Sequence, residues 1–224
     1  MKRKKAVSAA EMKEIERIAD SRGVSYRQMM ENAGTAAFEQ MRIKWPEAQK
    51  IVIFAGKGNN GGDSFVAARL YEKAGAQVTV ILCEGMPVTE DASYNFDKLT
   101  DAVKKYSLDG MGETGGIAEK EIGEADLIVD ALYGTGFHGT LRESGRRAAA
   151  MINGSGVPVC ALDLPSGMNA DTGEIAEGAV RADLTVVFHC RKLGHEAAGA
   201  EKQCGEIVVV SIGIDEVLDD NRKE

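Results

Sequence analysis

The fold is decided by the stretch KIVIFAGKGNNGGD, residues 50–63, in which a short apolar run leads directly into a glycine-rich segment. The run at 50–55 is continuous and partly β-branched, which is typical of a strand buried on both faces of a parallel sheet. The glycines that follow allow a tight turn and a close approach of the backbone to a ligand. Residues 62–74 then carry an apolar stripe at helical spacing, so the stretch predicts a strand, a binding loop and a crossover helix.

The same alternation of strands and helices continues along the chain. Strands are predicted at 78–82, 127–130, 157–162, 184–188 and 207–210, with a weak one between 103 and 108. Further helices are predicted at 89–105 and 141–153. This order predicts a Rossmann-like three-layer α/β/α sandwich with a mostly parallel sheet.

Two extra N-terminal helices precede the first strong strand. Residues 8–22 show helical spacing, and Ser8 with Glu11 forms a plausible capping box. A second helix is predicted at 26–43, with Ser25 as its cap. Because these helices fall outside the repeating pattern, we expect them to form a dimer interface. The polar tail after Asp215 is expected to fray.

Length and composition predict one domain over residues 1–224, with a core at about 7–214 and polar tails at both ends. The formal net charge of −8 argues against nucleic acid as a partner. No apolar run follows the basic start or reaches about 20 residues, so we expect no signal peptide and no membrane span.

The cysteines and histidines favour a reducing compartment over a metal centre. None of the four cysteines forms a C-x-x-C pair, which favours reduced, buried thiols and a cytoplasmic location. His189, Cys190 and His195 lie near one another in sequence, but their spacing matches no familiar zinc pattern.

The loop after the first strand satisfies G-x-G-x-x-G, with Glu84 about 23 residues beyond Gly61, close to the dinucleotide-binding spacing. That match alone is weak. Asn59 and Asn60 add amides to the turn, and the carboxylate of Asp63 would repel a pyrophosphate, so it suits a hydroxyl, a cation or a helix cap better. A tight turn without a ligand is the alternative.

Two more strands end in an acidic residue followed by a glycine-containing loop. Asp130 leads into residues 131–140, and Asp163 leads into residues 164–173, with the hydroxyl of Ser166 three positions on. Ligands of open α/β sheets bind at the carboxyl ends of the strands. Ordinary turns capped by the two aspartates are the alternative. Oxygen groups of this kind would favour a hard cation over zinc or copper.

Four segments, in this order, resemble the YjeF N-terminal domain family. They are MENAG at 30–34, GNNGGD at 58–63, DALYGTG at 130–136 and DLPSG at 163–167. The resemblance extends from about Val7 to Ile214. It implies a homodimeric NAD(P)HX epimerase, which interconverts the R and S forms of hydrated NADH and NADPH at C6 of the nicotinamide ring. A separate dehydratase, fused behind this domain in many bacteria, would rescue the S form. Because this chain stops near residue 224, that activity is expected elsewhere.

The resemblance also implies particular site residues. The implied substrate contacts are Asn59, Asn60, Gly61, Gly62, Asp63, Gly134, Thr135, Gly136, Phe137, His138, Gly139, Thr140 and Asp163. The implied ligands of a potassium ion (K⁺) are Asn60, Asp130 and Ser166. The sequence departs from the family pattern at Ser64, where glycine is usual, and at 189–192, where HCRK replaces Gly-x-Pro-Lys but keeps Lys192.

Our hypothesis is that Asp163 is the catalytic acid/base, because inversion at C6 needs proton transfer whether the ring opens or the hydroxyl leaves. His138 is the rival base. A noncatalytic nucleotide- or protein-binding scaffold of the same fold is the alternative function. An ordinary NAD-dependent dehydrogenase lacks a substrate domain here, and Tyr71 with Lys73 is not a Y-x-x-x-K pair. The preference between NADHX and NADPHX stays open.

Overall fold

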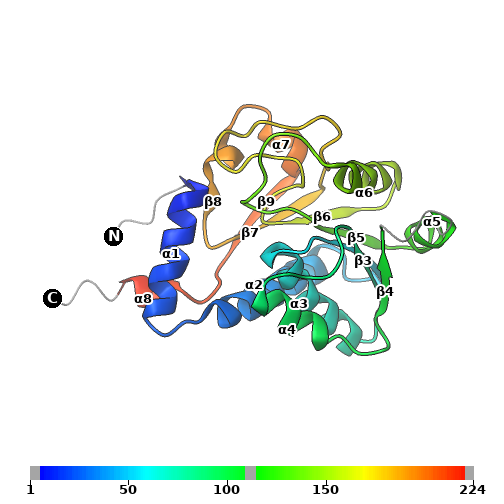
Figure 1. Ribbon diagram of the computed structural model, residues 1–224, viewed down its shortest axis with the longest axis horizontal. Coiled ribbons are helices and arrows are strands. Elements are labelled where there is room, and N and C mark those ends of the chain that lie inside the picture. The colour runs from blue at the N-terminus through cyan, green and yellow to red at the C-terminus, as the bar shows by residue number, and fades with distance from the viewer. Residues whose placement is uncertain (1–5, 109–114, 220–224) are drawn as a thin grey trace.

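The computed structural model describes residues 6–108 and 115–219 and centres on one seven-stranded sheet (Figure 1). Its strand order is β4-β3-β2-β5-β6-β7-β9, and every pairing is parallel. The strands are β2 (Lys50–Ala55), β3 (Gln77–Leu82), β4 (Lys104–Ser107), β5 (Leu127–Ala131), β6 (Val159–Leu162), β7 (Leu184–Phe188) and β9 (Glu206–Val210). The predicted parallel sheet is confirmed.

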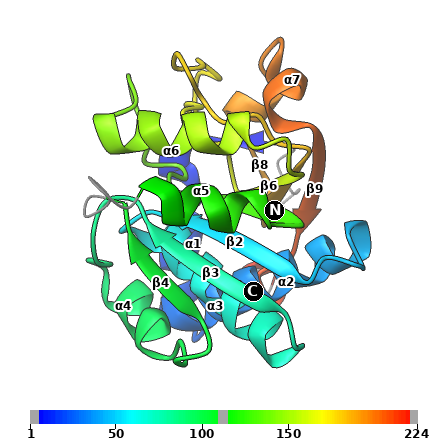
Figure 2. The ribbon, with the colours of Figure 1, turned by 90° about the vertical axis from the view of Figure 1, so that its right-hand side faces the viewer.

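Helices cover both faces of the sheet, which confirms the predicted three-layer sandwich (Figures 1 and 2). One layer holds α2 (Tyr26–Lys44), α3 (Asn59–Lys73) and α4 (Glu90–Asp97); the other holds α5 (Gly115–Gly123) and α6 (Glu143–Gly154). Side chains of β2 alternate between the two cores: Ile53 packs with the α2 and α3 side, and Phe54 with the α5 and α6 side. This burial on both faces explains why the strand sequence is continuously apolar.

The chain leaves β2 toward β3 and β4, then returns to place β5 on the other side of β2. The carboxyl ends of β2 and β5 therefore flank the point where the strand order reverses. In open α/β sheets this is the place where a crevice for a ligand forms. The topology thus puts residues 56–63 and 131–140 on either side of the expected site.

The second N-terminal helix, α2, packs in the helix layer beside α3. A Cβ added to Gly34 of α2 would overlap the carbonyl oxygen of Asp63 and the side chain of Val66 on α3. Glycine at this position lets the two helix backbones approach closely. The MENAG segment therefore has a packing role, because it sets α3 and its first turn against α2.

The first N-terminal helix, α1 (Ala9–Ser21), stands apart from the layers and lies beside β8 (Figure 1). The predicted capping box is present: the Glu11 amide donates to Ser8 Oγ at 3.1 Å, and the Ser8 amide donates to Glu11 Oε2 at 2.9 Å. Strand β1 (Ala6–Val7) pairs in parallel with β8 (Arg191–Lys192), and the Ala9 amide donates to Asp171 Oδ1 at 2.6 Å. These contacts hold α1 over the carboxyl edge of the main sheet.

Several predicted boundaries differ from the structure. The helix predicted at 89–105 ends at Asp97, because the chain turns at Thr100, whose hydroxyl accepts from the Ala102 amide at 3.2 Å, and then enters β4. The tail after Asp215 forms a short helix, α8 (Asp215–Asp219), because Val217 and Leu218 pack against the core. Residues 1–5 and 220–224 of the predicted tails lie outside the described residues.

The smaller elements were not predicted from sequence. They are β1, β8, α5, η1 (Leu193–Glu196) and α7 (Ala200–Cys204). Within the described ranges no helix combines the length and the apolar character that crossing a bilayer requires. The assignment of residues 1–224 to one domain stays a prediction.

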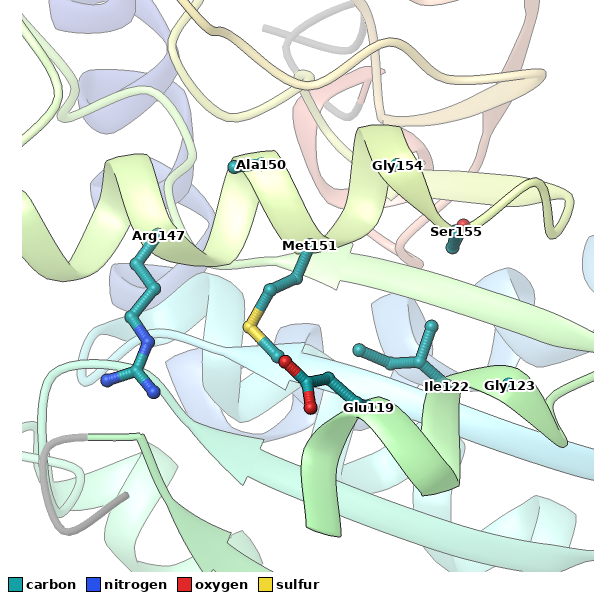
Figure 3. Close-up of a pocket in the computed structure, with 8 residues that line it drawn as sticks. All are labelled: Glu119, Ile122, Gly123, Arg147, Ala150, Met151, Gly154 and Ser155. Carbon is teal, nitrogen blue, oxygen red and sulfur yellow. The ribbon is translucent and has the colours of Figure 1, made fainter. Parts of the chain in front are cut away.

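A surface groove of about 580 Å³ lies between α5 and α6 (Figure 3). Met151 of α6 and Ile122 of α5 point toward the gap between the two helices. Gly123 and Ser155 also line it, at the helix ends that lead back to the amino ends of β5 and β6. The groove therefore faces the edge of the sheet opposite to the predicted site, and no predicted site residue lines it.

Candidate active site

The three predicted loops meet at the carboxyl edge of the sheet. A Cβ on Gly56 would overlap the carbonyl of Leu132, and a Cβ on Gly134 would lie 3.4 Å from Cβ and Cγ of Asn60. The Tyr133 amide donates to Ser166 Oγ at 2.9 Å. The segments after β2, β5 and β6 are thus in direct contact, as the strand-end analysis predicts.

The glycine-rich segment after β2 is the first turn of α3, which begins at Asn59 and not at residue 62 as predicted. Its N-cap is Gly58, so Asp63 is not the helix cap. A Cβ on Gly61 would overlap the carbonyl of Gly56, and one on Gly62 would lie 2.6 Å from the sulfur of Met30. These two glycines are therefore needed for packing, while the first-turn N–H groups offer donors to a ligand.

The other residues predicted to contact the substrate differ widely in exposure. Asn59, Gly136, His138, Gly139 and Thr140 are exposed, whereas Asn60, Asp63, Gly134 and Thr135 are half-buried. Phe137 is buried against Tyr133, with 5.3 Å between ring centroids. Tyr133 also donates to Glu84 Oε1 at 2.8 Å, so the acidic residue after β3 is tied to the second loop.

Asp130 and Ser166 form a buried pair beneath the loops. Both residues are fully buried. The Ser166 hydroxyl donates to Asp130 Oδ1 at 2.6 Å, and its amide donates to Oδ2 at 2.7 Å. Burial raises the pKa of Asp130 to about 6, although hydrogen bonds from Ser166 and from the Leu132 amide oppose the shift. The pair links the ends of β5 and β6.

The side chain of Asn60 lies against Gly134, next to the Tyr133 amide that binds Ser166, and it is suited to a cation. Its Nδ2 is buried without a hydrogen-bond partner among the described residues, and a buried polar atom of this kind calls for a ligand or a water. Turning the amide by 180° would present Oδ1 at the same place. With the carboxylate of Asp130 and the hydroxyl of Ser166, this gives the oxygen donors that a hard cation prefers.

Asp163 follows β6 in a left-handed backbone conformation, with φ of 65°. Aspartate tolerates this region better than most residues do. Its side chain accepts a hydrogen bond from Lys192 Nζ and another from the Phe188 amide at 3.2 Å. Lys192 is 1% exposed and also donates to the Phe188 carbonyl at 3.0 Å. Asp163 and Lys192 thus form a buried ion pair, in which the ammonium group balances the charge of the carboxylate.

Glu16 and Asp63 add two carboxyl groups near this ion pair, from α1 and from the first turn of α3. Among the described residues, neither carboxyl has a hydrogen-bond or salt-bridge partner. Burial and the negative charge of Asp163 raise the pKa of Glu16 to about 7, against the effect of Lys192. Burial, Asp163 and Glu16 raise the pKa of Asp63 well above its usual range. The site therefore holds two carboxyl groups whose surroundings favour the protonated form, beside the Asp163–Lys192 ion pair.

Sequence reasoning missed Glu16 and gave Lys192 no role. Glu16 lies in an amphipathic helix outside the motifs, and only the pairing of β1 with β8 brings it over the strand ends. The one signal in the sequence for a role of Lys192 is that it keeps the lysine of the family pattern. The rival base His138 is exposed on the second loop, where its Nδ1 lies 3.2 Å from Asn169 Nδ2.

We expect Glu16→Gln to stabilise the protein increasingly as the pH rises. The folded state raises the pKa of Glu16 from 4.5 to about 7, so it favours the protonated form. Stability from this group is fully present below pH 4.5 and is lost as the pH rises through 7. The variant should match the wild type near pH 4.5 and exceed it by on the order of 1–3 kcal/mol at pH 8.

Urea unfolding at several pH values measures this difference. Asp20→Asn is the matched control, because Asp20 lies on the exposed side of the same helix. A pH-independent difference between Glu16→Gln and the wild type would contradict the prediction.

A fully parallel sheet with polar residues gathered at the switch in strand order defines a Rossmann-like α/β protein with a ligand site at its carboxyl edge. The family model described as "YjeF-related protein N-terminus" matches residues 26–194. The chain therefore belongs to the YjeF-related N-terminal family, as the four motifs indicated.

Named relatives extend this comparison. An NAD(P)H-hydrate epimerase of Cenarchaeum symbiosum is 37% identical over 93% of this chain and 95% of its own length. A bifunctional NAD(P)H-hydrate repair enzyme of Pyrobaculum aerophilum is 39% identical over 93% of this chain, which covers 42% of that protein. The chain thus spans about two fifths of the bifunctional relative. The crystal structure of yeast ynu0 superimposes with a TM-score of 0.77 at 23% identity, over 93% of this chain and 88% of ynu0, and supports the fold.

Proposed function

We propose that this chain is an NAD(P)H-hydrate epimerase that interconverts the R and S forms of NADHX and NADPHX. The single observation that carries the proposal is the Asp163–Lys192 ion pair beside the carboxyl groups of Asp63 and Glu16, whose pKa values are raised, at the edge where the three loops meet. Relatives named for this activity, one of them matched along almost its whole length, support it.

The reaction requires proton transfer at C6 of the hydrated nicotinamide ring. If the hydroxyl leaves as water, an acid protonates its oxygen, and water returns to the other face of C6 and gives a proton back. If the ring opens, the C6 hydroxyl loses its proton as the C6–N bond breaks, the ring nitrogen takes the electron pair and a proton, and C6 becomes an aldehyde. After the aldehyde rotates, the reverse steps close the ring on the opposite face. Carboxyl groups whose environments hold them in different protonation states are suited to either route.

We assign the acid/base role to Asp163. Lys192 holds its side chain in one orientation, and the Phe188 amide fixes Oδ1. The N–H groups at the start of α3, with Asn59 and Asn60, bind polar or phosphate groups of the substrate, and residues 134–140 close over it from the β5 side. Burial and its acidic neighbours raise the pKa of Asp63, and in its protonated form this residue can donate a hydrogen bond to a substrate hydroxyl without repelling a phosphate.

A potassium ion fits the donor set of Asn60, Asp130 and Ser166. It would supply positive charge that fixes the loops after β2, β5 and β6. The unpartnered amide of Asn60 supports this assignment. Binding by both Asp130 and Ser166 requires their carboxylate and hydroxyl oxygens to turn toward the cation in addition to one another.

The assembly and location of the protein are proposed on sequence grounds. We propose a homodimer that acts together with an NAD(P)HX dehydratase in the cytoplasm, without nucleic acid as a partner. The four cysteines are buried, and none forms a disulfide with another described residue, which suits a reducing compartment. The buried face of α2 packs against α3. We therefore propose that α1 and the outer side of α2 form the dimer interface, and light scattering would measure the oligomeric state.

We expect the purified protein to convert R-NADHX to the S form well above the spontaneous rate, with higher activity in potassium than in sodium buffer. A chiral-resolving chromatographic assay measures the conversion, and the spontaneous reaction in each buffer is the control. Equal rates in both buffers would reject the potassium assignment alone. Tight binding of NADHX without turnover would reject the enzyme and favour the scaffold.

A further inference from the structure

His195 joins the backbone of Asp163 to the backbone of Lys192. Its Nδ1 lies 3.0 Å from the Lys192 amide nitrogen, and its Nε2 lies 3.0 Å from the Asp163 carbonyl oxygen. The side chain is buried, at 4% exposure, in the 3-10 helix η1 that directly follows β8. One imidazole ring therefore spans the two residues whose side chains form the ion pair.

The partners of His195 fix its protonation state. The Lys192 amide can only donate, so Nδ1 must accept; the Asp163 carbonyl can only accept, so Nε2 must carry the hydrogen. If Nδ1 carried the hydrogen, it would face the N–H of Lys192, so that two donors would meet at a nitrogen–nitrogen distance of 3.0 Å. Asp163, Lys192 and Arg191 are the charged groups around the ring. Burial is the main cause that lowers the pKa of His195 to about 4, so the ring stays neutral at physiological pH.

His195 contacts the backbone of Asp163 where that backbone is strained. Asp163 is one of two non-glycine residues with positive φ among the described residues, and this conformation persists only where surrounding contacts impose it. Its amide donates to the Val186 carbonyl at 2.8 Å, and its carbonyl accepts from His195. The two contacts fix both sides of the strained residue and so the direction of its carboxylate.

From these contacts we propose that His195 is a positioning residue for the reaction: as a neutral imidazole with hydrogen on Nε2, it fixes the left-handed backbone of Asp163 and ties it to Lys192. The inference rests on the proposed function, since it assigns His195 to the acid/base of that reaction. With both ring nitrogens engaged and the side chain buried, His195 does not reach the substrate.

The tautomer can be tested without any activity assay. The chain has three histidines, so long-range ¹H–¹⁵N spectra resolve each ring, and His195→Gln identifies the signals of residue 195. We expect hydrogen on Nε2, a bare Nδ1 and no titration between pH 8 and about 5. Hydrogen on Nδ1, or titration near 6.5, would overturn the proposal.

Two substitutions separate positioning from simple packing. Glutamine carries an acceptor and a donor on neighbouring atoms and can replace both hydrogen bonds, whereas leucine fills a similar volume and replaces neither. We expect His195→Leu to lower kcat on the order of 10- to 100-fold, because a small misplacement of a reacting group is costly. KM should change less than about threefold, and His195→Gln should recover most of kcat.

A third variant tests whether His195 acts through Asp163. In the Asp163→Asn background, His195→Leu should lower the residual rate little further, since the group it positions is already gone. The proposal would be overturned if His195→Gln and His195→Leu lost equal amounts of kcat, or if His195→Leu kept the wild-type kcat. It would also be overturned if the kcat losses of His195→Leu and Asp163→Asn multiplied fully in the double variant. A wild-type protein that does not epimerise NADHX but shows the expected tautomer would reject the proposed function and still support the anchoring of Asp163.

Discussion

Asp163→Asn is expected to lower the epimerisation rate by about 10²- to 10⁴-fold, the usual contribution of one general acid/base. The amide cannot transfer the proton that inversion at C6 requires. The local backbone should be kept, because asparagine tolerates the left-handed conformation at φ of 65° and its Oδ1 can still accept from the Phe188 amide. The loss should therefore fall on kcat. The melting temperature should fall, because Lys192 loses its counter-charge.

The assay is the conversion of R-NADHX at saturating substrate, with the melting temperature measured in parallel. Asp101→Asn is the matched control, since that aspartate is exposed in the turn before β4. Turnover by Asp163→Asn within a factor of about two of the wild type would remove Asp163 from the acid/base role. His138→Asn would then become the next variant to measure.

Lys192→Met is expected to cost about 3–5 kcal/mol of unfolding free energy, the largest stability effect we predict. Lys192 is 1% exposed, so its removal leaves the carboxylate of Asp163 without its counter-charge in a poorly hydrated place. The Phe188 carbonyl loses its second partner at the same time. Activity should fall as well, because the carboxylate is no longer held in one orientation.

Urea unfolding of the single and double variants measures this coupling. Adding Asp163→Asn to Lys192→Met should recover part of the loss, since a neutral amide needs no counter-charge. Lys73→Met is the control, because Lys73 is exposed at the end of α3. If the double variant is less stable than the wild type by the full sum of the two single losses, the two side chains do not act as a pair.

The layers of this fold could be predicted because the strands carry their own signal. Strand β2 at 50–55 and strand β7 at 184–188 match the predicted ranges, since each is an apolar run buried on both faces. Asp130 and Asp163, at the ends of β5 and β6, were expected to lie at one edge of the sheet, because parallel strands bring their carboxyl ends together. Predictions of this kind need only local pattern and one rule of topology.

The start of α3 and the inner side of the site could not be predicted in this way. Glycine disfavours helix, so residues 59–62 were interpreted as a loop; the structure needs Gly61 and Gly62 for contacts with Gly56 and Met30 that the local sequence does not reveal. Lysine is rarely buried, so nothing in the sequence marked Lys192 as the partner of Asp163. Glu16 and His195 enter the site only through contacts between distant parts of the chain.

The short pairing of β1 with β8 has a consequence for how the protein folds. Val7 lies opposite Lys192, so two segments separated by some 185 positions must come together before they can pair. Contacts this distant in sequence form late, because closing the intervening chain costs entropy that only the finished sheet offsets. Glu16 and the carboxyl edge of the sheet are therefore expected to come together late in folding, after the strands and the glycine-containing loops have formed.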